Sequence, residues 1–128
     1  MTYLLDVNAL VALGFVEHEF HHRISAWVKA QRSPSLGTCS ITELGFVRIL
    51  SQAPPYGFTV TQAQTLLLKL KRSGSFAFFP DDHDISRLPT WVKSPRQTTD
   101  GHLLELARAN QAVLATLDEK IPGAHLIR

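Results

Sequence analysis

Short apolar runs alternate along the chain with longer segments in which apolar residues recur every three to four positions. Short apolar runs favour strands, whereas the longer period is typical of helices that pack on a core. The predicted strands are residues 1–5, 36–39, 76–79, 111–116 and 125–128. The predicted helices are residues 7–16, 20–32, 40–52, 61–73, 85–92 and 100–109. This alternation indicates βα units, so we predict an α/β fold in which helices cover both faces of a central parallel sheet.

Turn-forming residues separate these segments. The run Ser33-Pro34-Ser35 closes the second helix, and Pro54-Pro55 stops the third, because proline cannot continue a helix. Pro89 interrupts the short helix expected over 85–92. No repeat, low-complexity tract or linker divides the 128 residues, 45% of which are hydrophobic. We therefore predict a single domain over 1–128.

Composition excludes several classes of protein. The single cysteine, Cys39, rules out an internal disulfide framework and suits a reducing cytoplasm, where we expect the protein to act. Six histidines beside one cysteine give no tetrahedral zinc spacing. Asp6 and Asn8 break the first apolar run, which has no basic region before it, so we expect neither a secretory signal nor a membrane span. A net charge of +2 is compatible with an anionic partner without demonstrating one.

The candidate chemistry lies in four acidic residues that follow strands or begin helices. Asp6 ends the first strand, and Asp118 follows the strand that ends near residue 116. Glu43 and Asp100 lie in the first turns of their helices, on the stripe that carries the core residues. Because chemistry in open parallel sheets collects at the carboxyl ends of strands, we expect these acids to meet at that edge.

Helix capping is the alternative for each acid taken singly. Asp is a common N-cap, Ser40-x-x-Glu43 has the sequence of a capping box, and Asp100 suits a helix dipole. Capping does not explain why four acids should converge. Crowded carboxylates raise each other's pKa values unless a cation neutralises them. Oxygen ligands without His or Cys favour magnesium or manganese over zinc.

Four short segments in the same order resemble the PIN-domain ribonucleases, and most closely the VapC-type toxins of bacterial toxin–antitoxin pairs. They are Asp6-Val7-Asn8, Glu43 ahead of Gly45-Phe46-Val47-Arg48, Thr98-Thr99-Asp100 with Leu103-Leu104, and Ala115-Thr116-Leu117-Asp118. The resemblance covers essentially the whole chain. It implies a three-layer α/β/α sandwich on a parallel sheet and a metal-dependent endoribonuclease. It also implies a homodimer and inhibition by a cognate antitoxin protein.

The resemblance also implies roles for particular residues. The catalytic and metal-binding acids would be Asp6, Glu43, Asp100 and Asp118, with Asn8 and Thr116 as supporting polar residues. These acids would hold one or two Mg²⁺ or Mn²⁺ ions that activate water for attack on an RNA phosphodiester. Glu119 stands beside Asp118 and leaves the fourth position open between the two. Gly101 stands where such sequences more often carry Ala.

Other functions stay open beside this one. A two-aspartate phosphatase needs a second Asp where Asn8 stands, and a phosphoacceptor receiver domain needs paired acids where Asp6 stands alone, with Lys120 only a loose match for its lysine. A third alternative is a PIN-like module that binds RNA or a partner without cutting.

Several charged or reactive residues outside this set have simpler interpretations. The acids Asp81, Asp82 and Asp84 suit a solvated turn or helix cap, because they lack the calcium-loop spacing. Cys39 suits a small buried residue. Arg48 and Arg96 are candidate contacts to RNA phosphates.

Overall fold

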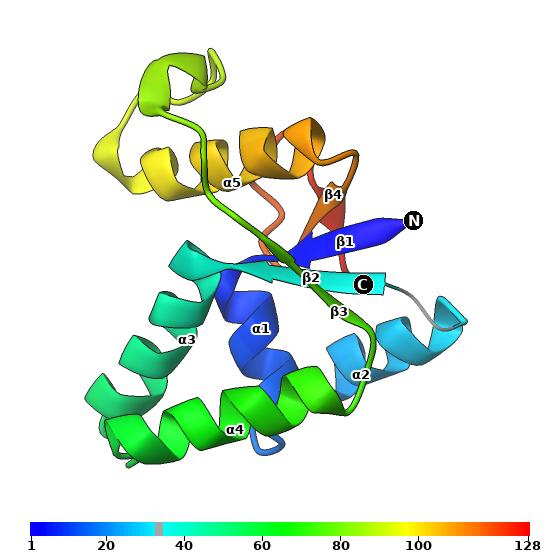
Figure 1. Ribbon diagram of the computed structural model, residues 1–128, viewed down its shortest axis with the longest axis vertical. Coiled ribbons are helices and arrows are strands. Elements are labelled where there is room, and N and C mark those ends of the chain that lie inside the picture. The colour runs from blue at the N-terminus through cyan, green and yellow to red at the C-terminus, as the bar shows by residue number, and fades with distance from the viewer. Residues whose placement is uncertain (33–34) are drawn as a thin grey trace.

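A five-stranded sheet forms the centre of the computed structural model, which describes residues 1–32 and 35–128 (Figure 1). Its strand order is β3-β2-β1-β4-β5, and every neighbouring pair is parallel. The strands are β1 (Thr2–Leu5), β2 (Ser35–Cys39), β3 (Phe76–Phe79), β4 (Val113–Thr116) and β5 (His125–Leu126). The predicted parallel sheet is confirmed.

Helices cover both faces of this sheet. They are α1 (Val7–Gly14), α2 (His21–Ala30), α3 (Ser40–Gln52), α4 (Val60–Arg72) and α5 (Thr98–Ala109). Figure 1 shows α5 on one face and the other four helices on the opposite face, which confirms the three-layer arrangement. A hydrophobic core lies on each face of the sheet, and β1 contributes residues to both, because consecutive strand residues point to opposite faces. Leu5 packs with the α1–α4 layer, and Leu4 packs with the α5 layer.

The register of the central strands determines which side chains meet at the carboxyl edge. Leu5 of β1 pairs with Ala115 of β4, so the residues that follow them, Asp6 and Thr116, become neighbours. On the other side of β1, Leu4 pairs with Gly37 of β2. All these strands run in one direction, so Asp6, the start of α3 and the residues after Thr116 share one edge of the sheet.

The segment between β3 and α5 differs from the prediction. A helix was expected over 85–92, but only a 3₁₀ helix, Ile85–Arg87, forms there, because Pro89 lacks an N–H and disfavours helical backbone at Leu88. A second 3₁₀ helix, Pro95–Gln97, leads directly into α5, which begins two residues earlier than predicted.

Other boundaries also differ: the helix predicted over 7–16 ends at Gly14, and the strand predicted over 125–128 ends at Leu126. Strand β4, which was predicted over 111–116, starts at Val113, because Gln111 has a left-handed backbone with a φ of 54°. The predicted break at Ser33-Pro34-Ser35 falls partly on positions 33 and 34, which lie outside the described residues. Within the described part of the chain, none of the helices is long and apolar enough to cross a membrane.

Candidate functional site

Asp6 is the buried centre of the candidate site. It follows β1 and caps α1, where its Oδ1 accepts a hydrogen bond of 2.9 Å from the backbone N–H of Ala9. The Thr116 hydroxyl donates to Oδ2, the other carboxylate oxygen. Only 5% of Asp6 is exposed, so its carboxyl group has lost nearly all contact with water. The predicted capping role of Asp6 and its place beside Thr116 therefore coexist.

Asp118 and Asp100 bring further negative charge to Asp6. The Asp118 backbone N–H donates to the Thr116 hydroxyl at 2.9 Å, which ties the residue to the end of β4. Burial raises the pKa of Asp6 from 3.8 to about 6, although hydrogen bonds from Thr116 and Ala9 lower it, and the charges of Asp100 and Asp118 raise it further. Partial burial, and then the charge of Asp118, also raise the pKa of Asp100.

These three aspartates fit a hard divalent cation. The raised pKa values of Asp6 and Asp100 mean that these two carboxyl groups are costly to ionise in their present surroundings, and a bound cation would remove that cost. The donor atoms are all carboxylate oxygens, as magnesium and manganese prefer. Across residues 1–32 and 35–128, no three His, Cys, Asp or Glu side chains stand in an arrangement ready to hold a metal ion. The fit therefore rests on the donor chemistry and the electrostatics of the cluster.

Glu43 is held by other partners. Its Oε2 accepts hydrogen bonds from the Lys71 ammonium group and from the Thr38 hydroxyl, each 2.6 Å long. The Glu43 and Lys71 side chains are 24% and 25% exposed, so their ion pair is partly screened from water. Asp100 and Asp118, but not Glu43, are among the charges that raise the pKa of Asp6. Of the four predicted acids, Asp100 and Asp118 thus act electrostatically on Asp6, whereas Glu43 pairs with Lys71.

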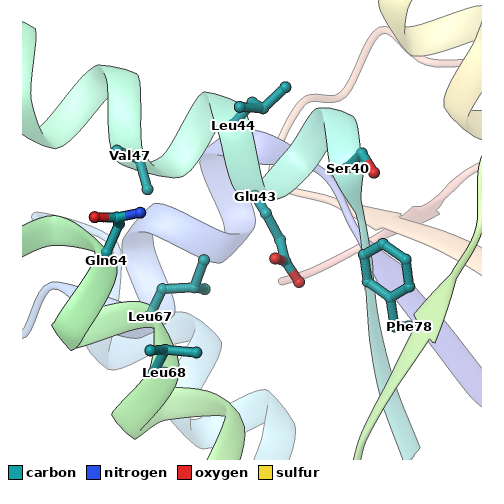
Figure 2. Close-up of a pocket in the computed structure, with 8 residues that line it drawn as sticks. All are labelled: Ser40, Glu43, Leu44, Val47, Gln64, Leu67, Leu68 and Phe78. Carbon is teal, nitrogen blue, oxygen red and sulfur yellow. The ribbon is translucent and has the colours of Figure 1, made fainter. Parts of the chain in front are cut away.

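The Glu43 carboxylate lies in a groove between α3 and α4. Figure 2 shows the side chain extending from α3 toward Leu67 and Phe78. The groove has a volume of about 410 Å³ and is lined by Ser40, Glu43, Leu44, Val47, Gln64, Leu67, Leu68 and Phe78. The expected Ser40–Glu43 capping box does not form. Instead Cys39 is the N-cap of α3, and the Thr42 hydroxyl is the reciprocal partner of its backbone.

Two clefts flank the aspartates, and Asp118 lines both. The first has a volume of about 250 Å³ and is lined by Trp91, Ser94, Arg96, Gln97, Asp100, Asp118, Lys120 and Ile121. The second has a volume of about 320 Å³ and is lined by Asn8, His18, Glu19, Phe20, Leu117 and Asp118. Asp118 rather than Glu119 thus lies beside the other acids. Of the supporting residues, Thr116 contacts Asp6 directly, whereas exposed Asn8 lies in the second cleft.

The remaining candidates lie away from this edge or have local partners. Arg48 is exposed on α3 and lines neither cleft. In the acidic loop, Asp84 caps the 3₁₀ helix and Asp81 pairs with His102 at 2.8 Å, which agrees with the turn and cap interpretation. Cys39 is buried, as expected.

Sequence reasoning missed the partners of Glu43. Thr38 is a polar residue inside a short buried strand, a signal that could have identified it. Lys71 gave no such signal, because it belongs to a basic run at the end of α4.

Curated ribonucleases share much of this sequence. Ribonuclease VapC38 of Mycobacterium tuberculosis is 40% identical over 119 residues, which cover 90% of this chain and 84% of that protein. Ribonuclease VapC44 of the same species is 36% identical, and the match covers 97% and 94% of the two chains. Ribonuclease VapC29 is 32% identical, with 98% and 92% covered. No family model matches the chain.

Solved structures of VapC proteins share the fold. The crystal structure of VapBC2 from Rickettsia felis bound to a promoter DNA fragment matches with a TM-score of 0.67 at 16% identity, over 98% of this chain and 97% of that chain. Mycobacterium tuberculosis VapC20, described as a sarcin–ricin loop cleaving toxin, matches with a TM-score of 0.64 at 12% identity, over 93% and 92%. With relatives at 32–40% identity over most of its length, the chain belongs to the VapC family of PIN-domain ribonucleases.

Proposed function

We propose that this protein is a magnesium- or manganese-dependent endoribonuclease and the toxin of a toxin–antitoxin pair. The observation that carries the proposal is the cluster of Asp6, Asp100 and Asp118, in which a buried carboxyl group is kept near two others at the carboxyl ends of β1 and β4. Membership of a family whose relatives are named ribonucleases supports the same activity. We assign this activity to a single domain over 1–128 that acts in the cytoplasm.

Asp6, Asp100 and Asp118 would hold the ion in this proposal. A bound divalent ion supplies a water of lowered pKa and stabilises the negative charge that develops on the phosphate. Thr116 fixes Asp6 by donating to Oδ2 and positions Asp118 by accepting its N–H, so one hydroxyl orients two of the acids. Glu43 would act beside them, held by Lys71 and Thr38. Water attacks directly in this scheme, and no side chain forms a covalent intermediate.

Basic side chains near the acids supply the contacts to RNA. Arg96 and Lys120 line the first cleft together with Asp100 and Asp118. Within the described ranges, neither cation has a carboxylate within 4.0 Å, so both are available to a backbone phosphate. Arg48 is a more distant RNA contact in this proposal, because it lies outside both clefts.

An antitoxin protein and a second copy of the chain are the proposed partners. The guanidinium group of an inhibitor's Arg would pair with two of the carboxylates and occupy the place of the metal. Two of the matching solved structures are named as VapBC complexes, which supports a partner of this kind. The proposal expects a co-expressed antitoxin to copurify and to silence RNA cleavage. A complex in which the inhibitor binds far from Asp6 and Asp100 would contradict this inhibition mechanism.

The test of the activity is RNA cleavage with and without metal. Purified protein should cleave structured RNA in magnesium, lose cleavage in chelator and regain it when magnesium or manganese is restored. Cleavage that persists undiminished in chelator would refute the metal-dependent mechanism. Hydrolysis of small phosphate monoesters without RNA cleavage would favour the aspartate-based phosphatase. RNA binding without cleavage in either metal would favour the non-catalytic module.

A further inference from the structure

The segment that joins α1 to α2 forms one wall of the second cleft. We propose that this cleft is a nucleobase pocket that selects the nucleotide next to the phosphodiester bond to be cut, an inference that rests on the proposed ribonuclease function. His18, Glu19 and Phe20 come from the connecting segment, Asn8 comes from α1, and Leu117 follows β4. The volume of about 320 Å³ is within the range of small-ligand pockets.

The charges of the second cleft exclude a phosphate and suit a base. Its lining includes no Lys or Arg, and it carries the exposed carboxylate of Glu19, which repels a phosphate. A nucleobase is uncharged, and its edge presents hydrogen-bond donors and acceptors. The Asn8 amide offers both, and Glu19 offers acceptors for an exocyclic amine. Leu117 supplies apolar surface against which a base can pack, and the Phe20 ring already carries the Arg23 guanidinium group 4.7 Å from its centroid.

His18 contributes a donor whose position is fixed by the backbone. Its Nδ1 accepts a hydrogen bond of 3.0 Å from the Phe20 N–H, so the proton of the neutral ring is on Nε2. Burial lowers the pKa of His18, although the charge of Glu19 opposes this effect, and the neutral ring is therefore favoured. His18 thus offers one N–H, and the neighbouring Glu19 offers a carboxylate. This pairing of donor and acceptor distinguishes one base edge from another.

The two clefts divide the contacts to RNA between them. Asp118 lines both, so a strand whose backbone is bound by Arg96 and Lys120 in the first cleft passes the acids before it reaches the second. The cationic cleft suits the backbone, which has the same charge in every sequence. The uncharged and acidic side chains of the second cleft suit the base, which carries the sequence information. Sequence preference should therefore depend on the second cleft.

The test is the cleavage preference on an RNA pool with randomised positions, read by sequencing the product ends. The variants are Glu19→Gln and His18→Leu, and the matched control is Glu17→Gln, a second exposed Glu of the same segment that does not line the cleft. The parent should prefer particular bases at one position next to the cut. Both variants should change the relative cleavage of those bases by about fivefold or more, since one base-edge contact discriminates by that much. The control should keep the parent's profile.

The outcomes separate this inference from the proposed function. If the parent cleaves the pool and both variants keep its base preference, or slow every sequence equally, the nucleobase pocket is refuted while the ribonuclease stands. A parent that prefers no base next to the cut also refutes the pocket alone. A parent that cleaves nothing in magnesium or manganese refutes the proposed function and the inference with it.

Discussion

Asp6 combines a stabilising hydrogen-bonding role with a destabilising charge. Its carboxylate caps α1 and accepts from Thr116, which favours the folded chain. Its burial near Asp100 and Asp118 makes ionisation costly, which opposes folding at neutral pH. A raised pKa means that the folded protein holds the proton more tightly than the unfolded chain does. The stability that Asp6 contributes is therefore complete below pH 3.8 and is lost as the pH rises through about 6.

The first prediction concerns Asp6→Asn in chelator. A pKa raised from 3.8 to about 6 corresponds to about 3 kcal/mol of lost stability at pH 7. The amide oxygen of Asn can still accept a hydrogen bond from the Ala9 N–H. The amide nitrogen cannot accept one from the Thr116 hydroxyl, and this loss costs about 1 kcal/mol. We expect Asp6→Asn to melt at an equal or higher temperature than the parent at pH 7, with no advantage at pH 4. Thermal melts across this pH range provide the measurement.

A suitable control for Asp6→Asn is Asp84→Asn, which alters an exposed aspartate that caps a 3₁₀ helix. Hydrogen bonds from Ser86 lower the pKa of Asp84, so its replacement should bring no gain at pH 7. If Asp6→Asn melts well below the parent at pH 7, the carboxylate serves chiefly as a cap, and the crowded-charge account of Asp6 is wrong.

Gly101 allows close packing next to α5, although glycine is a poor helix former. The sequence showed only a glycine where the proteins it resembles more often carry Ala. In the structure, a Cβ at this position would collide with Cγ2 of Val92 and would lie 3.1 Å from Cδ of Pro89. The missing side chain therefore allows the segment before α5 to lie against the helix, near Asp100.

We expect Gly101→Ala to destabilise the protein. Overpacking costs about 1–3 kcal/mol, and the better helix propensity of Ala returns about 1 kcal/mol at most. Urea denaturation measures the difference, and Gly74→Ala is the matched control, because its added Cβ would make only ordinary contacts at 3.5 Å or more. A Gly101→Ala variant that is more stable than the parent would show that the contact with Val92 relaxes freely.

At the scale of elements, periodicity predicted the strands and most helices because each one carries its signal locally. The amphipathic stripe of α4 and the short apolar run of β3 needed no distant information. The helix predicted over 85–92 is reduced to a 3₁₀ helix, because Pro89 and packing against α5 determine the backbone there. In the site, the strand ends predicted that Asp6 and Asp118 would lie at the same edge of the sheet. Nothing local could predict that Lys71 on α4 would pair with Glu43 on α3.

We expect the ion pair between Lys71 of α4 and Glu43 of α3 to stabilise the folded protein. Lys71→Met should destabilise the protein by about 1–2 kcal/mol, between the values for exposed and buried pairs, because Glu43 keeps its charge beside an apolar groove. Adding Glu43→Gln should recover part of this loss, since the unpaired charge is then removed. A double-mutant cycle by urea denaturation measures the coupling, with exposed Lys69→Met as the control. Strictly additive effects would show that the pair contributes nothing.

The topology of the whole molecule explains why chemistry belongs at this edge. The chain proceeds from β1 outward through β2 to β3, and then returns to place β4 on the other side of β1. The direction of winding therefore reverses between β1 and β4, where α1 and α5 lie on opposite faces (Figure 1). Ligands of open α/β sheets bind at such a switch point, outside the carboxyl ends of the strands. Asp6 and Asp118 follow the two strands that define it.

The most direct test of the three-aspartate metal site is Mn²⁺ binding by the purified chain, measured by titration calorimetry. We expect the parent to bind Mn²⁺ and Asp100→Asn to bind it at least about tenfold more weakly, since even the loss of a residue that supports a ligand costs that much. Asp82→Asn removes an exposed carboxylate outside the cluster and should bind like the parent. If the parent binds no Mn²⁺, or if Asp100→Asn binds it as tightly as the parent, the metal site assigned to Asp6, Asp100 and Asp118 is wrong.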